Sequence, residues 1–337
     1  ILSAIASGAR RGVLFRGGAA IETLADVHIV ALDKTGTLTH GVPELVRIDV
    51  YAGDEASVLS AAYNLARLST HPLSRAIQRA GVQRGASSVE FSHAESHAGS
   101  GMTARKDGLL YVLGNREFVR SRLKEAAHDA PPADETDVAE VWVAGPRLCG
   151  RLLLRDELRS EARGVLNQLR RLGMRVVMLT GDRQTTAELI AREAGVDDVR
   201  AQLSPEGKVN AVQQLKEAGA KVAMIGDGVN DAPCLAAADV GVAMGARGSD
   251  AAMEQAEVVL MNDKLENFLA AYQLSRRAKR IIGQNITIAL GTVVIMALLA
   301  LSRGIPLSLG VVAHEGSTVI VVVNSRRLLF TNSRVKA

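Results

Sequence analysis

Cysteine is nearly absent from this chain, with 2 residues in 337. That number excludes a disulfide-stapled scaffold and a zinc fold built on several cysteines. Aromatic side chains make up only 3% of the residues. An excess of one charge is also lacking, because 40 Lys and Arg stand against 36 Asp and Glu. This near balance does not indicate a nucleic-acid-binding protein.

Apolar residues are abundant and unevenly distributed. They form 47% of the chain, and the mean hydropathy is +0.12 although 23% of the residues are charged. At roughly 150 residues per domain, the length predicts about two domains. Residues 1–6 are typical of the end of a longer apolar helix. We therefore expect a fragment of a larger protein, in which residues 1–25 are the end of a transmembrane helix and a linker.

An alternation of strands and helices predicts the main fold. Four short apolar runs, each followed by a turn, indicate buried strands: residues 27–32, 175–179, 221–225 and 239–244. Helical patterns such as residues 161–172 lie between them. Strand, polar loop and helix in repetition predict a doubly wound parallel sheet. In such a sheet the functional site lies beyond the carboxyl ends of the strands.

Another pattern interrupts this alternation. It contains a helical stretch over residues 57–80 and strand-like runs over 109–113 and 141–143. Both flanks belong to the sheet pattern, so we expect an inserted α+β domain. The expected boundaries are residues 26–40 plus 153–265 for the sheet domain, 41–152 for the insertion and 266–337 for the C-terminal part.

The C-terminal part is the most apolar. No Asp, Glu, Lys or Arg occurs between Arg280 and Arg303, and only Glu315 occurs between Arg303 and Arg326. A bilayer core needs about 20 apolar residues per helix. Because Lys and Arg cluster at the outer ends, the pattern predicts a transmembrane hairpin, over about 282–302 and 305–325, with both ends cytoplasmic. The alternative is a hairpin buried in a soluble core.

The first buried strand is followed by Asp33-Lys34-Thr35-Gly36-Thr37. A carboxylate presented at the edge of a sheet can attack a phosphoryl group and form an acyl phosphate. Many hydrolases with this kind of sheet have a second aspartate two residues later, where this chain has Thr35. Threonine is a poor general acid or base. This favours a long-lived phosphoenzyme over a simple phosphatase.

Three further loops are expected at the same edge. Thr180-Gly181-Asp182 offers a hydroxyl and an N–H group to phosphate oxygens, Lys208 supplies positive charge, and Asp227 is suited to Mg²⁺. The alternative is that these are ordinary polar turns. The expected catalytic residues are Asp33, Lys34, Thr35, Thr180, Gly181, Asp182, Lys208, Asp227, Asn230 and Asp231.

A polar run interrupts the second apolar stretch of the C-terminal part. His314 and Glu315 lie at mid-depth, where ionisable side chains are costly and indicate function. Imidazole and carboxylate ligands suit Zn²⁺ or Co²⁺ better than Cu⁺. His314 and Thr318 share a helix face, so His314, Glu315 and Thr318 are the candidate ligands of a transported metal. The alternative is a polar cluster that packs helices together.

These motifs resemble those of a known family. Residues 33–39, 180–182 and 226–233 resemble the three hallmark loops of P-type ATPases. His71-Pro72 resembles the histidine-proline motif of the heavy-metal-transporting branch. Residues 314–318 resemble the motif of its cobalt/zinc type. The chain is therefore similar to the C-terminal catalytic portion of such an ATPase.

The resemblance implies a haloacid-dehalogenase-like phosphorylation domain and an inserted nucleotide-binding domain. ATP would phosphorylate Asp33, and Asp33, the Thr35 carbonyl and Asp227 would hold Mg²⁺. The residues implied in ATP binding are His71, Gly99, Gly101 and Asn115. One position departs from the pattern, because related domains have a glutamate five residues before the histidine and this chain has Ala66.

The predicted function is ATP-driven export of Zn²⁺, Co²⁺ or Cd²⁺ across a bacterial plasma membrane. The protein would be multi-pass in the lipid bilayer, with its catalytic domains cytoplasmic. The family's actuator domain and first membrane helices have no match in this chain, so the fragment is expected to bind nucleotide without pumping. The alternatives are a membrane-anchored haloacid-dehalogenase-type phosphohydrolase, a regulatory protein without turnover, or an ATPase for copper or potassium.

Overall fold

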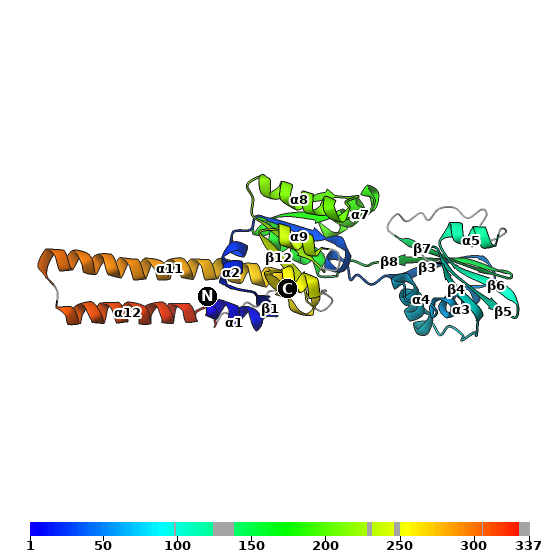
Figure 1. Cartoon of the computed structure of the whole chain (residues 1–337), viewed down its shortest axis with the longest axis horizontal. Coiled ribbons are helices and arrows are strands. Elements are labelled where there is room, and N and C mark those ends of the chain that lie inside the picture. The colour runs from blue at the N-terminus through cyan, green and yellow to red at the C-terminus, as the bar shows by residue number, and fades with distance from the viewer. Residues whose placement is uncertain (98, 124–137, 228–230, 246–249, 305, 330–337) are drawn as a thin grey trace. The chain divides into compact units, whose positions relative to one another are not determined.

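The computed structural model describes residues 1–97, 99–123, 138–227, 231–245, 250–304 and 306–329. It divides into two compact units (Figure 1). The inserted unit runs from Thr39 to Arg159, slightly beyond the expected 41–152 at both ends. The parallel-sheet unit comprises Ile1–Leu38 and Ser160–Ala337. Each unit has its own hydrophobic core.

The parallel-sheet unit contains seven strands in the order β1-β13-β12-β11-β2-β9-β10. β1 pairs antiparallel with β13, and the other neighbours pair in parallel. β2, β11 and β12 are buried along their whole length, as expected where helices cover both faces of a sheet. The doubly wound sheet is thereby confirmed. The strands are β1 (Val13–Phe15), β2 (Ile29–Asp33), β9 (Arg175–Leu179), β10 (Asp198–Arg200), β11 (Val222–Gly226), β12 (Val240–Met244) and β13 (Val258–Leu260).

Helices join the parallel strands and close the core. Val212 and Leu215 of one helix and Leu235 of another pack on the sheet residues. Because β9, β2 and β11 are neighbours in register, the residues that follow these strands meet at one edge of the sheet. The helices are α1 (Leu2–Ala9), α2 (Gly18–Ala25), α6 (Ala162–Arg171), α7 (Gln184–Ala194), α8 (Pro205–Glu217), α9 (Ala232–Ala237) and α10 (Asp250–Gln255).

Strand β1 lies within residues 1–25, where a helix end and a linker were expected. Val13 and Phe15 are buried, whereas Leu14 between them is exposed. This alternation is that of a strand with one face on the core. The parallel-sheet unit therefore takes one of its two edge strands from a segment in which no strand was predicted.

The inserted unit is a six-stranded antiparallel sheet in the order β3-β8-β7-β6-β5-β4. α3 and α4 pack on one face, and Phe118 and Val119 of α5 pack on the other. The elements are β3 (Glu44–Ala52), α3 (Glu55–Ala66), α4 (Pro72–Gln83), β4 (Ser92–His97), β5 (Gly101–Lys106), β6 (Leu109–Gly114), α5 (Arg116–Arg122), β7 (Ala139–Gly145) and β8 (Leu148–Arg155).

The single helical stretch expected over residues 57–80 is wrong, because the chain forms two helices there. Pro72 has no amide hydrogen and occupies the first turn of α4, a position that suits proline. His71 caps this helix, and its Nδ1 accepts a hydrogen bond of 3.3 Å from the Leu73 amide. The interruption therefore fixes the position of His71.

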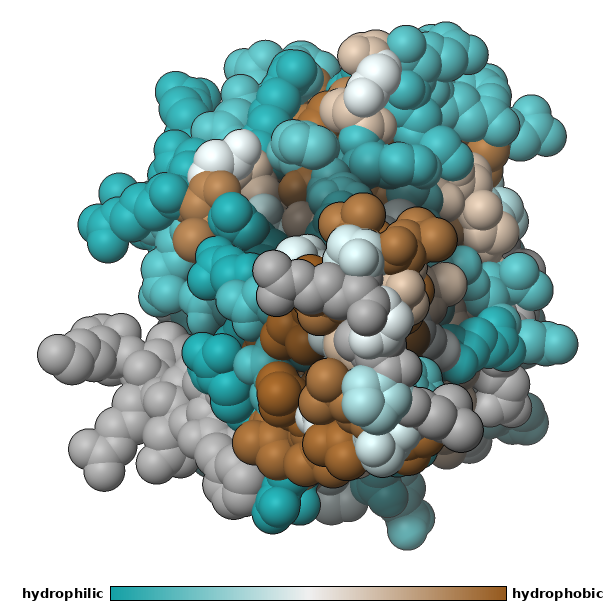
Figure 2. Space-filling view, turned by 90° about the vertical axis from the view of Figure 1, so that its left-hand side faces the viewer, coloured by the Kyte–Doolittle hydropathy of each residue, from teal (hydrophilic) through white to brown (hydrophobic). Residues whose placement is uncertain are grey.

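α11 (Glu266–Arg303) and α12 (Leu307–Arg326) lie side by side (Figure 1). α11 begins with buried residues such as Phe268 and Tyr272. Farther along, large apolar side chains of both helices are exposed, and Figure 2 shows apolar residues gathered on this end. They include Ile286, Leu290, Val293, Leu298, Leu301, Val312, Val319, Ile320 and Val323.

One of the two expected spans meets the length and composition of a membrane helix. Within the described part of the chain, Glu266–Ser302 is the one helix long and apolar enough to cross a membrane. The other expected span, over 305–325, corresponds to α12 and stays a prediction.

A close approach between α3 and α4 gives a first prediction. A Cβ atom at Gly81 would lie 2.4 Å from Cδ2 of Tyr63. Overpacking of this kind costs about 1–3 kcal/mol, more than the helix propensity gained from alanine, about 1 kcal/mol. Gly81→Ala should therefore reduce the hydrogen-exchange protection of α4, measured by mass spectrometry.

The matched control is Gly164→Ala in α6, where no atom lies within 4 Å of the added Cβ. The same chemical change should there raise protection or leave it unchanged. Unchanged protection of α4 in Gly81→Ala would contradict the close packing of Gly81 on Tyr63.

Candidate active site

Asp33 is the last residue of β2, and it is only 5% exposed. The chain then turns through residues 34–38, with Gly36 at φ +74°. A Cβ atom at Gly36 would lie 2.5 Å from Oδ2 of Asp227, which follows β11. Glycine is needed here both for the backbone conformation and for the contact between the two loops. Thr35 is exposed in the same turn.

Lys208 connects two of the carboxyl groups. Its Nζ lies 2.5 Å from Oδ1 of Asp33 and 2.9 Å from Oδ1 of Asp231. The Ser204 hydroxyl caps α8 by accepting a hydrogen bond from the Gly207 amide at 3.0 Å. This cap sets the start of the helix that carries Lys208. Asp231 precedes α9 and is 1% exposed.

The loop after β9 lies at the same edge. The Lys34 ammonium forms an ion pair of 2.6 Å with Asp182, and the Asp182 amide donates to the Thr180 hydroxyl at 3.2 Å. The Thr180 amide donates to the Arg200 carbonyl. The structure thus brings together the expected catalytic residues around Asp33, including Gly181 between Thr180 and Asp182. Asn230 lies outside the described residues.

Charge and burial shift the pKa values of this cluster in a consistent way. Burial, followed by repulsion from Asp231, raises the pKa of Asp33 to about 7, although Lys208 opposes the shift. Burial lowers the pKa of Lys208, but Asp33 and Asp231 outweigh it and hold the pKa above its usual value. Lys208 is therefore a fixed positive charge. Ionisation of Asp33, in contrast, costs free energy in the folded protein.

The same carboxylates fit a magnesium ion. Asp227 adds to the repulsion that raises the pKa of Asp33, and it contacts the loop that follows Asp33. Mg²⁺ is usually held by one or two carboxylates together with phosphate and water. Carboxylates as close together as Asp33 and Asp227 are suitable ligands, so the residues fit this cofactor.

The inserted unit contains a cavity of about 510 Å³, within the range of small-molecule sites. It is lined by all four residues expected to bind nucleotide: His71, Gly99, Gly101 and Asn115. They come from the start of α4, the β4–β5 turn, β5 and the cap of α5. Their role in nucleotide binding stays a prediction.

Two of these residues also have structural roles. A Cβ atom at Gly101 would lie 2.2 Å from the Leu113 carbonyl oxygen, so β5 and β6 require glycine there. Oδ1 of Asn115 accepts a hydrogen bond of 2.8 Å from the Phe118 amide and caps α5. Ala66, the departure noted above, is fully buried in the core and does not line the cavity.

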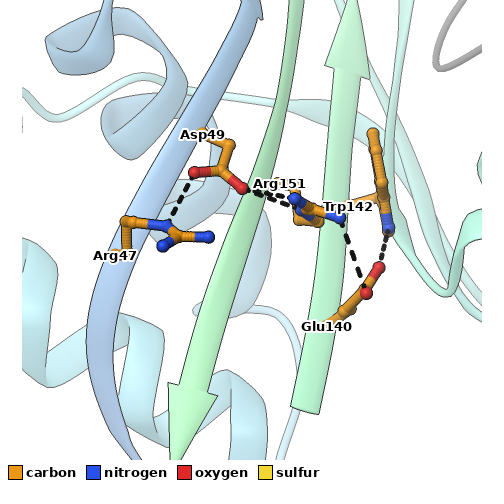
Figure 3. A network of polar contacts seen from close by, with 5 residues as sticks. All are labelled: Arg47, Asp49, Glu140, Trp142 and Arg151. Carbon is orange, nitrogen blue, oxygen red and sulfur yellow. Dashed lines mark hydrogen bonds and ion pairs between the residues drawn. The ribbon is translucent and has the colours of Figure 1, made fainter. Parts of the chain in front are cut away.

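The sequence did not identify His97 and Glu140, which also line this cavity. The His97 ring packs on Phe118 with ring centroids 5.0 Å apart. Glu140 accepts a hydrogen bond of 3.1 Å from Nε1 of Trp142 and lies 3.6 Å from Arg151, which also pairs with Asp49 (Figure 3). The only available signal was the charge of Glu140 in an apolar strand. Its partner Arg151 lies on the neighbouring strand β8, and Asp49 on β3 pairs with Arg151.

His314, Glu315 and Thr318 are exposed on α12. The hydroxyl groups of Ser317 and Thr318 donate to the His314 carbonyl at 2.7 and 3.2 Å. Among the described residues, no group of three or more His, Cys, Asp or Glu could hold a metal ion. The described part of the chain adds no further ligand of these types to His314 and Glu315.

Known proteins are similar to this chain in sequence and in fold. Residues 27–239 match the family model of the haloacid dehalogenase-like hydrolases. The chain is 39% identical to the zinc-transporting ATPase of Bacillus subtilis (strain 168), over 97% of this chain and 52% of that protein. A zinc-transporting PIB-type ATPase crystallised in its E2.Pi state matches 98% of this chain and 54% of its own, with 36% identity and a TM-score of 0.83. The catalytic domain of the CPx-ATPase CopB-B, described for conformational changes upon nucleotide binding, matches 80% of this chain and 98% of its own, with 26% identity and a TM-score of 0.65.

Names of other relatives specify different metals. They include a probable cadmium-transporting ATPase of Listeria monocytogenes, 36% identical over 98% of this chain and 47% of that protein. A probable cobalt/nickel-exporting P-type ATPase of Mycolicibacterium smegmatis is 39% identical over 98% of this chain and 51% of that protein. The chain spans about half the length of the curated relatives it matches.

The buried aspartate at the edge of a parallel sheet and the matching family model agree: the chain belongs to the haloacid dehalogenase-like hydrolases. Within them it is similar to zinc-transporting ATPases over about half of the length of those proteins. The resemblance of the three loops is thereby confirmed.

The raised pKa of Asp33 predicts how stability depends on pH. The folded state holds the Asp33 proton up to about pH 7, whereas the unfolded state loses it near pH 4. Ionisation therefore costs stability as the pH rises. Asp33→Asn avoids this cost, so without Mg²⁺ its stability relative to wild type should increase by about 2–3 kcal/mol between pH 5 and pH 8. Calorimetry in detergent with a chelator measures this difference.

Asp239→Asn is a control with the opposite sign. The Val222 amide and Lys221 outweigh the burial of Asp239 and lower its pKa. Wild type gains stability from this carboxylate above the unfolded pKa and loses it at acidic pH, so Asp239→Asn should be most harmful near neutrality. If the free energy of unfolding changed with pH in the same way in wild type and in Asp33→Asn, the raised pKa of the buried Asp33 would be contradicted.

Proposed function

We propose that Asp33 accepts the terminal phosphoryl group of ATP and forms an aspartyl phosphate. The observation that carries this proposal is the buried contact of Asp33 with Lys208. The ionised carboxylate attacks phosphorus, and ADP departs with the electrons of the broken P–O bond. Lys208 stabilises the charge that develops on the transferred group. When bound by Asp33, the Thr35 carbonyl and Asp227, Mg²⁺ neutralises phosphate charge.

The inserted unit holds the nucleotide in this proposal. The cavity beside His71 is large enough for a base and ribose, and Gly99 leaves the backbone open to a close ligand because no atom lies within 4 Å of its missing Cβ. The side-chain amide of Asn115 offers N–H donors while its oxygen caps α5. These features support binding of ATP by residues 41–152.

For the whole protein, we propose ATP-driven export of a divalent heavy metal across a bacterial plasma membrane. The exposed apolar surfaces of α11 and α12 support two membrane spans, over about 282–302 and 305–325. The Lys and Arg clusters at their outer ends favour cytoplasmic catalytic domains. His314, Glu315 and Thr318 would take part in binding Zn²⁺, Co²⁺ or Cd²⁺, since imidazole and carboxylate suit such borderline metals.

Labelling of the intact protein tests the phosphoryl-transfer step. Incubation with ATP carrying a radioactive terminal phosphate should produce acid-stable, hydroxylamine-labile label. Asp33→Asn should abolish it, because an amide cannot form the acyl phosphate. Asp239→Asn should retain it. Fast hydrolysis of small phosphate esters without such label would instead support a phosphohydrolase.

Replacement of Asn115 separates its two roles. Asn115→Asp keeps the oxygen that caps α5 but replaces the amide donors with a negative charge. ATP binding by this chain should weaken about tenfold or more, measured by calorimetry, with little change in melting temperature. Asn115→Ala should also lose the cap, which is worth about 1 kcal/mol. Wild-type affinity in Asn115→Asp would exclude a donor role for Asn115.

The metal site is tested in the intact protein. His314→Ala and Glu315→Ala should each reduce zinc- and cobalt-stimulated ATP hydrolysis by roughly tenfold or more, since even outer partners of metal ligands cost that much. Ser317→Ala is the control, because its hydroxyl hydrogen-bonds to the helix backbone. Equal stimulation of ATP hydrolysis by zinc and cobalt in all variants and in wild type would contradict the proposed metal site.

A further inference from the structure

The loop between α3 and α4 forms part of the wall of the cavity in the inserted unit. Ser69, Thr70 and His71 line this cavity one after another. Within residues 67–71 only Ser69 is half-buried, and the other residues are exposed. Burial of apolar side chains therefore contributes little to holding the loop in place. Its conformation depends on hydrogen bonds instead.

Gln78 of α4 supplies two of these hydrogen bonds. Its side-chain Nε2 donates to the Ala66 carbonyl at 2.7 Å and to the Ser69 carbonyl at 3.3 Å. Ala66 is the last residue of α3, so its carbonyl lacks the amide partner that it would have inside a helix. The Gln78 side chain therefore joins the end of α3 to the loop. It does so from outside the cavity, because Gln78 is not among the lining residues.

The hydrogen bonds continue from Ser69 to the ring of His71. The Ser69 hydroxyl accepts a bond of 3.2 Å from the His71 amide. At the next step, the Leu73 amide donates to Nδ1 of His71. A neutral imidazole that accepts through Nδ1 carries its hydrogen on Nε2. The position of this N–H donor in the cavity wall is therefore determined by a chain of bonds that begins at Gln78.

We propose that Gln78 is a positioning residue for nucleotide binding. It acts through Ser69 and His71 and makes no contact with the nucleotide itself. The inference rests on the proposed binding of ATP in the cavity of the inserted unit. A loop that adopts its binding conformation for only a fraction of the time lowers the apparent affinity by that fraction. The hydrogen bonds of Gln78 keep this fraction high.

Removal of the side-chain amide tests the proposal. Gln78→Leu keeps a side chain of similar size but has no donor for the carbonyls of Ala66 and Ser69. The affinity of this chain for ATP, measured by calorimetry, should fall about fivefold, which is the effect of one typical hydrogen bond. In the intact protein, the KM for ATP should rise by a similar factor while kcat is unchanged, because only binding is weakened.

A second glutamine of α4 provides the matched control. Gln83 is exposed at the end of the helix and does not line the cavity, so Gln83→Leu should keep the wild-type affinity. Gln78→Lys supplies N–H donors again and should bind ATP more tightly than Gln78→Leu. Gln83→Lys adds the same charge away from the loop. It therefore shows how much of that recovery is due to charge alone.

A double-mutant cycle separates positioning of His71 from a general structural role. In a His71→Ala background, Gln78→Leu should weaken ATP binding by about twofold or less, because the group that Gln78 positions is already missing. Residues that act independently give additive effects instead. The same loss of affinity in both backgrounds, or a fall in kcat together with the rise in KM, would overturn the positioning role.

Failure of this inference is distinguishable from failure of the proposed nucleotide site. If the wild-type chain bound ATP and Gln78→Leu bound it equally well, only the role of Gln78 would be overturned. If the wild-type chain did not bind ATP at all, the nucleotide site proposed for the inserted unit would be contradicted, and the inference about Gln78 with it.

Discussion

The contact of Lys208 with Asp33 and Asp231 is the interaction on which the site depends. All three side chains are largely buried, and removing one partner of a buried ion pair costs about 3–5 kcal/mol. β2, α8 and α9 must therefore keep their positions for the charges to remain paired. Although Lys208 opposes the shift, burial and repulsion from Asp231 raise the pKa of Asp33 to about 7. A carboxylate whose ionisation is this costly gains from any ligand that brings positive charge.

The rest of the parallel-sheet unit places this cluster. Continuous burial of β2 brings Asp33 to the sheet edge, and Gly36 allows the following turn to contact Asp227. The inserted unit also brings its candidate site residues together, but around a cavity. Its cavity is formed where a helix cap, two strand ends and a tight turn converge, with Gly101 required by backbone packing alone. In both units, the conformation and packing of the backbone determine where the candidate functional side chains lie.

Much of this could be predicted because local signals agreed with the fold. An apolar run that ends in aspartate identifies a buried strand and its edge. β1 was missed because three residues are too short for a pattern. The break before Pro72 was missed because the helical period continues across it. The pairing of Asp231 with Lys208, and of Glu140 with Arg151, depends on tertiary contacts. The second span over 305–325 stays a prediction, because it rests on the absence of Lys and Arg between Arg303 and Arg326.

Chemical trapping of the phosphorylated residue tests the central claim most directly. The intact protein would be incubated with ATP, reduced with borohydride, digested and analysed by peptide mass spectrometry. Borohydride converts an aspartyl phosphate to homoserine. The account predicts homoserine at position 33 and at no other aspartate. Homoserine at position 227 or 231, or none anywhere while ATP is consumed, would contradict it.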